Sequence, residues 1–215
     1  MPKKYKTKMQ LNTATKKLQA FMDRAKFWNE NYSKYYRITD VVLLGSLARK
    51  ENKVSDIDLC VKVERVQGFG LQEHLSSYLA WRKDVLGYAV PVDFGAQISS
   101  FESDVTRYLK AKDGRYDVLR WRELAGLSLT LDPQVTLIRN GIAQYESAEL
   151  AIEEAASISQ ENALSLIEDG AVSREDVYWE SYCNALSKFP SFVRDAILER
   201  DESQQEYLSF VEERA

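Results

Sequence analysis

Two apolar runs on either side of a glycine-serine pair constrain the fold of this 215-residue chain more than any other feature. Residues 38–44 are β-branched and apolar, and this run stops at Gly45. Residues 56–63 alternate between apolar and other side chains, which is the period of a strand with one buried face. Both patterns predict strands, so this part of the chain is expected to form a sheet.

Helices and one further strand are predicted around these two runs. Apolar residues at helical spacing predict helices over residues 13–32 and 71–86, and another helix is expected over residues 101–110. Residues 88–94 predict a third strand, in which Pro91 indicates an edge position or an irregularity.

The amino-acid composition of the chain changes after Pro133. The following residues are rich in Ala, Glu, Ile and Leu, and no glycine interrupts residues 142–169. Ser173 resembles a helix N-cap followed by acidic residues, and further helical segments are expected to the end of the sequence. We therefore predict an α+β fold, with a mixed α/β domain over residues 1–134 and a small helical domain over residues 135–215.

The composition excludes several classes of protein. An apolar fraction of 45% with 11% aromatic residues is enough to build a core, which excludes global disorder. No apolar run approaches the length of a membrane span, and no apolar segment follows the basic start as in a secretory signal. Two cysteines, Cys60 and Cys183, are too few for a disulfide framework. An intracellular, cytoplasmic protein is expected.

Charge is distributed unevenly along the chain. Residues 1–50 contain 12 Lys and Arg against 3 Asp and Glu, a balance of +9, whereas residues 141–215 contain 5 against 17, a balance of -12. The basic end could contact phosphates, dock on an acidic tail, or simply be solvated. The acidic last third argues against nonspecific wrapping of nucleic acid by the whole chain.

Asp56 and Asp58 are the first candidates for chemistry. Side chains alternate along a strand, so these two carboxylates project to the same side. Two close carboxylates repel each other unless a cation lies between them or one is protonated, and Mg²⁺ prefers such hard oxygen ligands. Gly45 and Ser46 directly follow a strand, where backbone N–H groups and a serine hydroxyl can hold phosphate oxygens.

Asp93 supplies a third carboxylate if its predicted strand pairs beside the strand of Asp56 and Asp58. Three carboxylates can hold two metal ions about 3.5–4 Å apart, and Asp93 would then also be the general base for an incoming hydroxyl. Arg49 and Lys53 lie between the glycine-serine pair and the carboxylates, where cations could steer a triphosphate. A solvated loop is the alternative for Lys53, and Arg49 could instead brace a neighbouring carboxylate.

The segment Gly45-Ser46-Leu47-Ala48-Arg49, followed by Ser55-Asp56-Ile57-Asp58-Leu59, resembles the signature of the polymerase beta-like nucleotidyltransferase superfamily, minimal nucleotidyltransferase type. The resemblance covers roughly residues 36–95. It implies a mixed sheet flanked by helices, and transfer of a nucleoside monophosphate from an NTP to a hydroxyl. It also implies Mg²⁺, with Mn²⁺ as a substitute, bound by the matching Asp56, Asp58 and Asp93, with Gly45 and Ser46 against the triphosphate. Relatives commonly have glycine where this chain has Lys50.

We therefore expect a metal-dependent nucleotidyltransferase with ATP as the first candidate donor. The acceptor is expected to be a protein or an RNA, as in toxin–antitoxin or defence-type relatives. Alternatives are a small acceptor such as an aminoglycoside or lincosamide antibiotic, and a non-catalytic module that binds a nucleotide or a partner. The helical tail is expected to define the acceptor or to contact a partner protein or a second copy of the chain.

Several other residues have two interpretations. His74, the only histidine, is expected to be structural. Trp121, between Arg120 and Arg122, could frame an acceptor or a base, or could pack on the surface. One aromatic cluster could stack on bases, but a helix packed against the sheet explains it more simply. This cluster comprises Phe27, Trp28, Tyr32, Tyr35 and Tyr36.

Overall fold

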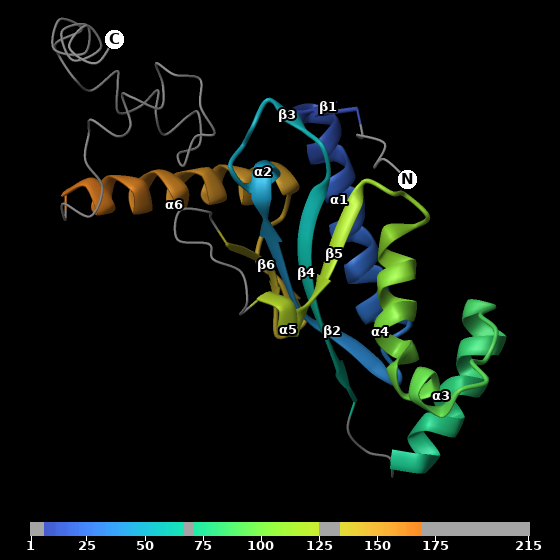
Figure 1. Ribbon diagram of the computed structural model, residues 1–215. Helices are drawn as coiled ribbons and strands as arrows, with labels where there is room; N and C mark the ends of the chain where they lie inside the picture. The colour runs from blue at the N-terminus through green and yellow to red at the C-terminus, as the bar shows by residue number, and fades with distance from the viewer. Residues whose placement is uncertain (1–6, 67–70, 125–133, 169–215) are drawn as a thin grey trace, which may run out of the picture.

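The computed structural model describes residues 7–66, 71–124 and 134–168, and these form a mixed sheet with helices around it (Figure 1). The described elements are, in chain order, β1 (Met9–Gln10), α1 (Leu11–Asn31), β2 (Tyr36–Leu44), α2 (Gly45–Ala48), β3 (Lys53–Val54), β4 (Ile57–Arg65), α3 (Leu71–Leu86), α4 (Phe94–Lys110), β5 (Tyr116–Arg120), α5 (Trp121–Leu124), β6 (Val135–Arg139), β7 (Ile142–Ala143) and α6 (Ala148–Glu168).

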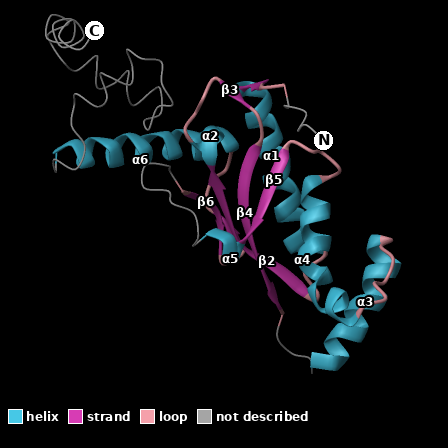
Figure 2. Cartoon of the chain, viewed as in Figure 1, coloured by secondary structure: helices cyan, strands magenta, loops and turns pink. Residues whose placement is uncertain are grey.

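The main sheet has the strand order β5-β4-β2-β6-β7 (Figure 2). β4 and β5 are parallel, and the other neighbours are antiparallel. A parallel pair needs a long crossover connection, which α3 and α4 provide here. The mixed sheet flanked by helices confirms the predicted α+β class.

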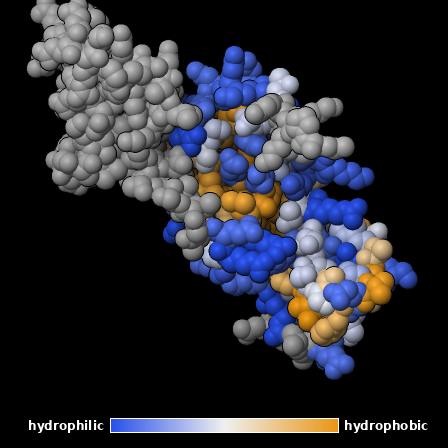
Figure 3. Space-filling view, viewed as in Figure 1, coloured by the Kyte–Doolittle hydropathy of each residue, from blue (hydrophilic) through white to orange (hydrophobic). Residues whose placement is uncertain are grey.

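The two faces of the sheet differ because side chains alternate along each strand. On β4, Ile57 and Leu59 are buried in the main core, which α1 and α4 cover. The opposite face, which we call the open face, carries a smaller apolar cluster of Val42, Leu44 and Cys60. Figure 3 shows apolar side chains gathered over the middle of this face.

α1 supplies the largest side chains of the main core. The expected helix over residues 13–32 is confirmed, and its buried side chains recur at helical spacing. They are Ala14, Thr15, Leu18, Phe21, Met22, Ala25 and Trp28. The aromatic cluster belongs mainly to this packing, because Trp28, Tyr35 and Tyr36 are buried, and His74 lies edge-on against both tyrosine rings. These three members of the cluster are therefore core residues rather than a base-stacking surface, whereas Phe27 is exposed.

α3 and α4 are joined by a buried ion pair. Arg82 donates to both carboxylate oxygens of Asp104, through Nε to Oδ2 and through Nη2 to Oδ1 at 3.0 Å. Tyr78 donates to the same Asp104 Oδ2 at 2.6 Å, and burial together with this hydrogen bond raises the pKa of Tyr78. The pair fixes α3 against α4. α3 matches the helix expected over residues 71–86, and α4 contains the helix expected over residues 101–110 but begins earlier, at Phe94.

The predicted strand over residues 88–94 is wrong. Residues 88–93 form an irregular connection, and Phe94 begins α4. Gly87, at φ +68°, follows the end of α3, and Pro91 has no N–H to donate to a neighbouring strand. Asp93 accepts the N–H of Ala96 at 2.7 Å, so it is the N-cap of α4 rather than a strand residue.

The sheet continues past residue 134. β6 begins at Val135 and pairs with β2, and the first half of α6 packs into the main core through Ala151 and Ile152. The helical segments expected from Ser173 onward lie outside the described residues. Within the described ranges, no helix is both long enough and apolar enough to cross a bilayer.

Substitution of Asp104 by Asn should strongly destabilise the chain, because it leaves the Arg82 charge buried without its counter-ion. We expect a loss of about 3–5 kcal/mol in the free energy of unfolding, measured by chemical denaturation. Glu30→Gln is the control: it breaks the exposed Lys26–Glu30 pair and should cost less than about 1 kcal/mol. Equal, small losses in both variants would show that α3 does not depend on the Arg82–Asp104 pair.

The turn between α4 and β5 makes the stability of the folded chain depend on pH. Asp113 pairs with Lys17 of α1 and accepts the N–H of Arg115 at 2.9 Å. Burial acts to raise the pKa of Asp113, but these hydrogen bonds outweigh it and lower the pKa below its ordinary value. The stabilising contribution of Asp113 is therefore complete above the unfolded-state pKa and is lost as pH falls through the lower folded-state pKa.

Denaturation of the wild type and of Asp113→Asn between neutral pH and about pH 2 tests this linkage. The wild type should be the more stable near neutral pH, and its advantage should shrink below about pH 4, near the unfolded-state pKa of an aspartate. An advantage that stays constant over this range would contradict the assignment.

Candidate active site

Gly45 and Asp58 approach each other more closely than any side chain at position 45 would allow. Leu44 is the register partner of Asp58 in the antiparallel β2–β4 pair, so Gly45 begins α2 directly beside that carboxylate. A Cβ added to Gly45 would lie 2.2 Å from Oδ2 of Asp58. Gly45 also has φ +70°, which favours glycine. The structure thus brings together Gly45, Ser46 and Asp58.

Asp56 lies immediately before β4, in a loop that is held from two sides. Ser55 Oγ donates to Asp56 Oδ1 at 2.6 Å. Arg115 Nη1 donates to the carbonyl of Ser55 at 3.1 Å and to that of Thr7 at 2.6 Å. Asp56 and Asp58 are both half-buried; alternation along β4 directs Asp58 to the open face, and Asp56 lies two positions before it in the preceding loop.

Asp117 is a third carboxylate on the open face, and the sequence analysis missed it. It is the register partner of Asp58 in the parallel β4–β5 pair. Tyr116 and Val118 pack into the main core, so Asp117 between them projects to the opposite side, where it is exposed. Neighbouring strands lie about 4.8 Å apart, which makes Asp58 and Asp117 lateral neighbours. The β-favouring residues Tyr116, Val118 and Leu119 carried the signal for this strand.

Asp93 does not join Asp56 and Asp58. It caps the beginning of α4, whereas the end of α4 leads into β5 beside the start of β4. A 17-residue helix is about 25 Å long, and Figure 1 shows that the beginning of α4 lies at the end of the sheet remote from α2. Asp93 is exposed at that remote end.

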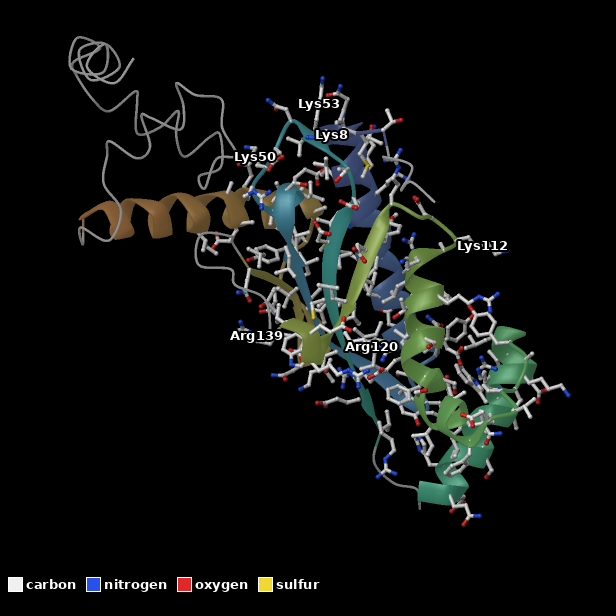
Figure 4. The ribbon with its side chains drawn as sticks, viewed as in Figure 1. Lys8, Lys50, Lys53, Lys112, Arg120 and Arg139 are labelled. Atoms are coloured by element: carbon white, nitrogen blue, oxygen red, sulfur yellow. The ribbon has the colours of Figure 1, made fainter. Side chains whose placement is uncertain are left out.

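The cations expected around the site differ in their ion-pair partners and in their exposure. Arg49 pairs with Glu51, with Nη2 2.8 Å from Oε1, which matches the expected bracing of a neighbouring carboxylate. Lys50 has φ +56°, the backbone region that favours glycine, and its Nζ lies 2.6 Å from the carboxylate of Glu153 on α6. Lys53 is exposed on β3, and Figure 4 shows Lys50 and Lys53 at the end of the sheet that carries α2.

The donor chemistry of this group suits a hard divalent cation, since Asp56, Asp58 and Asp117 offer only carboxylate oxygens. Among the residues that the structure describes, no three His, Cys, Asp or Glu side chains are gathered closely enough to hold a metal ion. Cys60 lies between Asp58 and Lys62 on the same face, but burial, helped by Glu123, raises the pKa of its thiol to about 11. Cys60 is therefore part of the apolar floor and remains protonated.

Comparison with protein-family models matches residues 24–116 to the nucleotidyltransferase domain. The matched segment runs from α1 to the start of β5 and includes Gly45, Ser46, Asp56 and Asp58, while Asp117 follows it directly. Comparisons with curated proteins and with solved structures gave no significant match.

The contact between Gly45 and Asp58 can be tested against a second glycine with the same backbone conformation. Gly87 has φ +68°, but a Cβ there would meet nothing within 4 Å. Gly87→Ala should therefore lower the free energy of unfolding by only about 1–2 kcal/mol, the cost of placing alanine in the left-handed backbone region. Gly45→Ala should lose more, by about 1–3 kcal/mol, because Asp58 must be displaced as well.

Asp58→Ala in the Gly45→Ala background should recover part of that additional loss, because it removes the oxygen that the new methyl group meets. Strictly additive effects of the two substitutions would mean that Gly45 and Asp58 are not in contact.

Proposed function

We propose that this chain transfers a nucleoside monophosphate from an NTP to a hydroxyl acceptor, a proposal that the match of residues 24–116 to the nucleotidyltransferase domain supports. The observation that carries the proposal is the alignment of Gly45, Asp58 and Asp117 across three successive segments of the open face. It combines a glycine whose backbone lies directly against the Asp58 carboxylate with carboxylates from two adjacent strands.

The triphosphate of the donor, with ATP as the first candidate, would lie against Gly45 and Ser46. The missing side chain at Gly45 supports this, since it leaves the backbone and the Asp58 carboxylate accessible to the same ligand. Lys53, at the same end of the sheet, is available to attract the phosphates, and Arg49 would serve the same purpose after leaving Glu51.

Asp56, Asp58 and Asp117 are the residues proposed to hold Mg²⁺ or Mn²⁺, two ions in the complete site. A bound divalent cation would neutralise phosphate oxygens and stabilise the leaving diphosphate. Asp117 replaces Asp93 in this proposal, because Asp93 lies at the remote end of α4. The Ser55 and Arg115 hydrogen bonds hold the loop that carries Asp56 and so limit its motion.

The proposed reaction is a substitution at the α-phosphorus. The acceptor hydroxyl oxygen forms a bond to that phosphorus, and the bond from phosphorus to the diphosphate oxygen breaks. The hydroxyl proton passes to the Asp117 carboxylate, which is exposed and therefore accessible to an acceptor. Diphosphate leaves with the negative charge.

A non-catalytic nucleotide-binding module is the second candidate. The remote position of Asp93 favours it, because the third carboxylate expected from the sequence is absent from the site. Asp117 favours catalysis, because it restores three carboxylates to one face. We propose the enzyme, with an intracellular acceptor such as an RNA or a protein of a toxin–antitoxin or defence system; a small antibiotic acceptor is the alternative.

Transfer of label from each α-labelled NTP to RNA, protein and aminoglycoside fractions tests the proposal. Asp58→Asn and Asp117→Asn should each lower the rate by about 10²–10³-fold or more, the cost of losing one group that stabilises a transition state. Asp93→Asn is the matched control and should stay within about threefold of the wild type, because Asp93 only caps a helix.

The melting temperature with Mg²⁺ and each NTP separates binding from catalysis. A ligand that binds only the folded chain at a hundred times its Kd adds about 2.7 kcal/mol of stability. A stabilising NTP with no labelled product in any fraction would favour the binding module. Loss of transfer in Asp93→Asn but not in Asp117→Asn would overturn our choice of third carboxylate.

A further inference from the structure

A cleft opens where β5 ends and β4 continues. The β4–β5 pairing stops at Val61 and Arg120, while β4 extends to Arg65. The cleft has a volume of about 230 Å³. It is lined by Val61, Lys62, Val63, Glu102, Thr106, Leu119, Arg120, Trp121 and Arg122. Pockets that enclose a whole drug-sized ligand measure about 300–1,000 Å³, so this cleft suits one unit of a larger molecule.

The cleft combines an exposed aromatic ring with cations. Trp121 is 36% exposed, and the Nζ of Lys62 lies 5.9 Å from the centre of its ring. Arg120 and Arg122 flank the tryptophan, and Figure 4 shows Arg120 at the end of β5 beside α5. An aromatic platform between cations is the arrangement that binds single-stranded nucleic acid, because bases stack on the ring while phosphates meet the charges.

The cations of the cleft are available to a phosphate. Lys62 lies 2.7 Å from Glu64, and Arg120 lies 3.5 Å from Glu102, but solvent-exposed ion pairs of this kind contribute little. Arg122 makes no ion pair with any residue of the described ranges. Of the three cations that line the cleft, Lys62 and Arg120 are paired with exposed or half-buried carboxylates, Asp40 also lies 3.9 Å from Lys62, and Arg122 supplies the charge that has no ion-pair partner among the described residues.

The cleft lies in line with the candidate active site. Lys62 is four positions beyond Asp58 on β4, so both side chains project to the open face, about 13 Å apart along the strand. Cys60 and Leu119 form an apolar floor between them. The cleft opens at the end of β5, where Glu102 and Thr106 of α4 line its other side. A molecule that extends along the open face can therefore reach the carboxylates at one end and the Lys62 and Trp121 side of the cleft at the other.

We propose that the Trp121 cleft binds a nucleotide of a single-stranded RNA acceptor, and that this contact selects RNA as the substrate class. The inference rests on the proposed function, which assigns the donor triphosphate to the Gly45 end of the open face. A donor held there has no further phosphate for Arg120 and Arg122, so their charges suit the backbone of a second, nucleotide-containing molecule. A protein or aminoglycoside acceptor would bring no such phosphate.

RNA binding without Mg²⁺ or NTP tests the proposal independently of catalysis. The probe is a short fluorescein-labelled single-stranded RNA, and the anisotropy of its fluorescence is followed as the full chain is added at several salt concentrations. Trp121→Leu should weaken binding by about tenfold, as expected for the loss of one base–aromatic stack. Arg122→Gln should weaken binding and make it less dependent on salt.

Matched controls separate this cleft from general surface effects. Phe27→Leu removes an exposed aromatic ring of α1, and Arg139→Gln removes an exposed cation of β6; neither residue lines the cleft. Both controls should bind RNA within about twofold of the wild type. The thermal stabilisation by ATP and Mg²⁺ should be the same in Trp121→Leu as in the wild type.

Three results would overturn the inference. In the first, Trp121→Leu binds RNA as well as the wild type does. In the second, Trp121→Leu loses the stabilisation by ATP while its RNA binding stays intact, which would assign the cleft to the base of the donor nucleotide. The wild type could also label proteins but bind no RNA. Tight, Trp121-dependent RNA binding with no nucleotide transfer would instead leave this inference standing and remove the proposed function.

Discussion

The antiparallel pairing of β2 with β4 is the constraint on which the rest of the structure depends. It places Leu44 opposite Asp58, and so sets the glycine at the end of one strand against the carboxylate at the start of the next. A shift of one residue would turn Asp58 into the main core and Ile57 out of it. The burial of Ile57 and Leu59 beneath α1 therefore also fixes the side on which the acidic residues project.

The parts of the site that the sequence predicted depend on local patterns. Gly45 and Ser46 begin the short helix α2 directly after β2, Asp56 lies in the loop before β4, and Asp58 lies in β4, so all four are within a few residues of strands that local alternation predicts. Asp93 was misassigned because an apolar run that contains Pro91 can be read as a strand or as a connection that ends at a helix cap. The hydrogen bond from the N–H of Ala96 to Asp93 shows that Asp93 is the N-cap of α4.

Asp117 could not be assigned from a local pattern, because its position beside Asp58 depends on where two distant strands pair. That register follows from the α3–α4 crossover, from the buried pair of Arg82 and Asp104, and from the turn held by Asp113 and Lys17. The same register leaves the last part of β4 beyond the end of β5, which opens the Trp121 cleft. A single long-range pairing thus determines both the third carboxylate and the cleft.

The strand order also implies an order of events during folding. Leu44 and Asp58 are 14 positions apart in the chain, so the β2–β4 pair closes a short loop. Asp58 and Asp117 are 59 positions apart and meet only after two helices have folded over the sheet. Long-range parallel pairing is slow to form because its loop-closure entropy is lost before its contacts are gained. The Gly45–Asp58 half of the site would therefore form before Asp117 joins it, and the chain would gain its full set of carboxylates only in a later step.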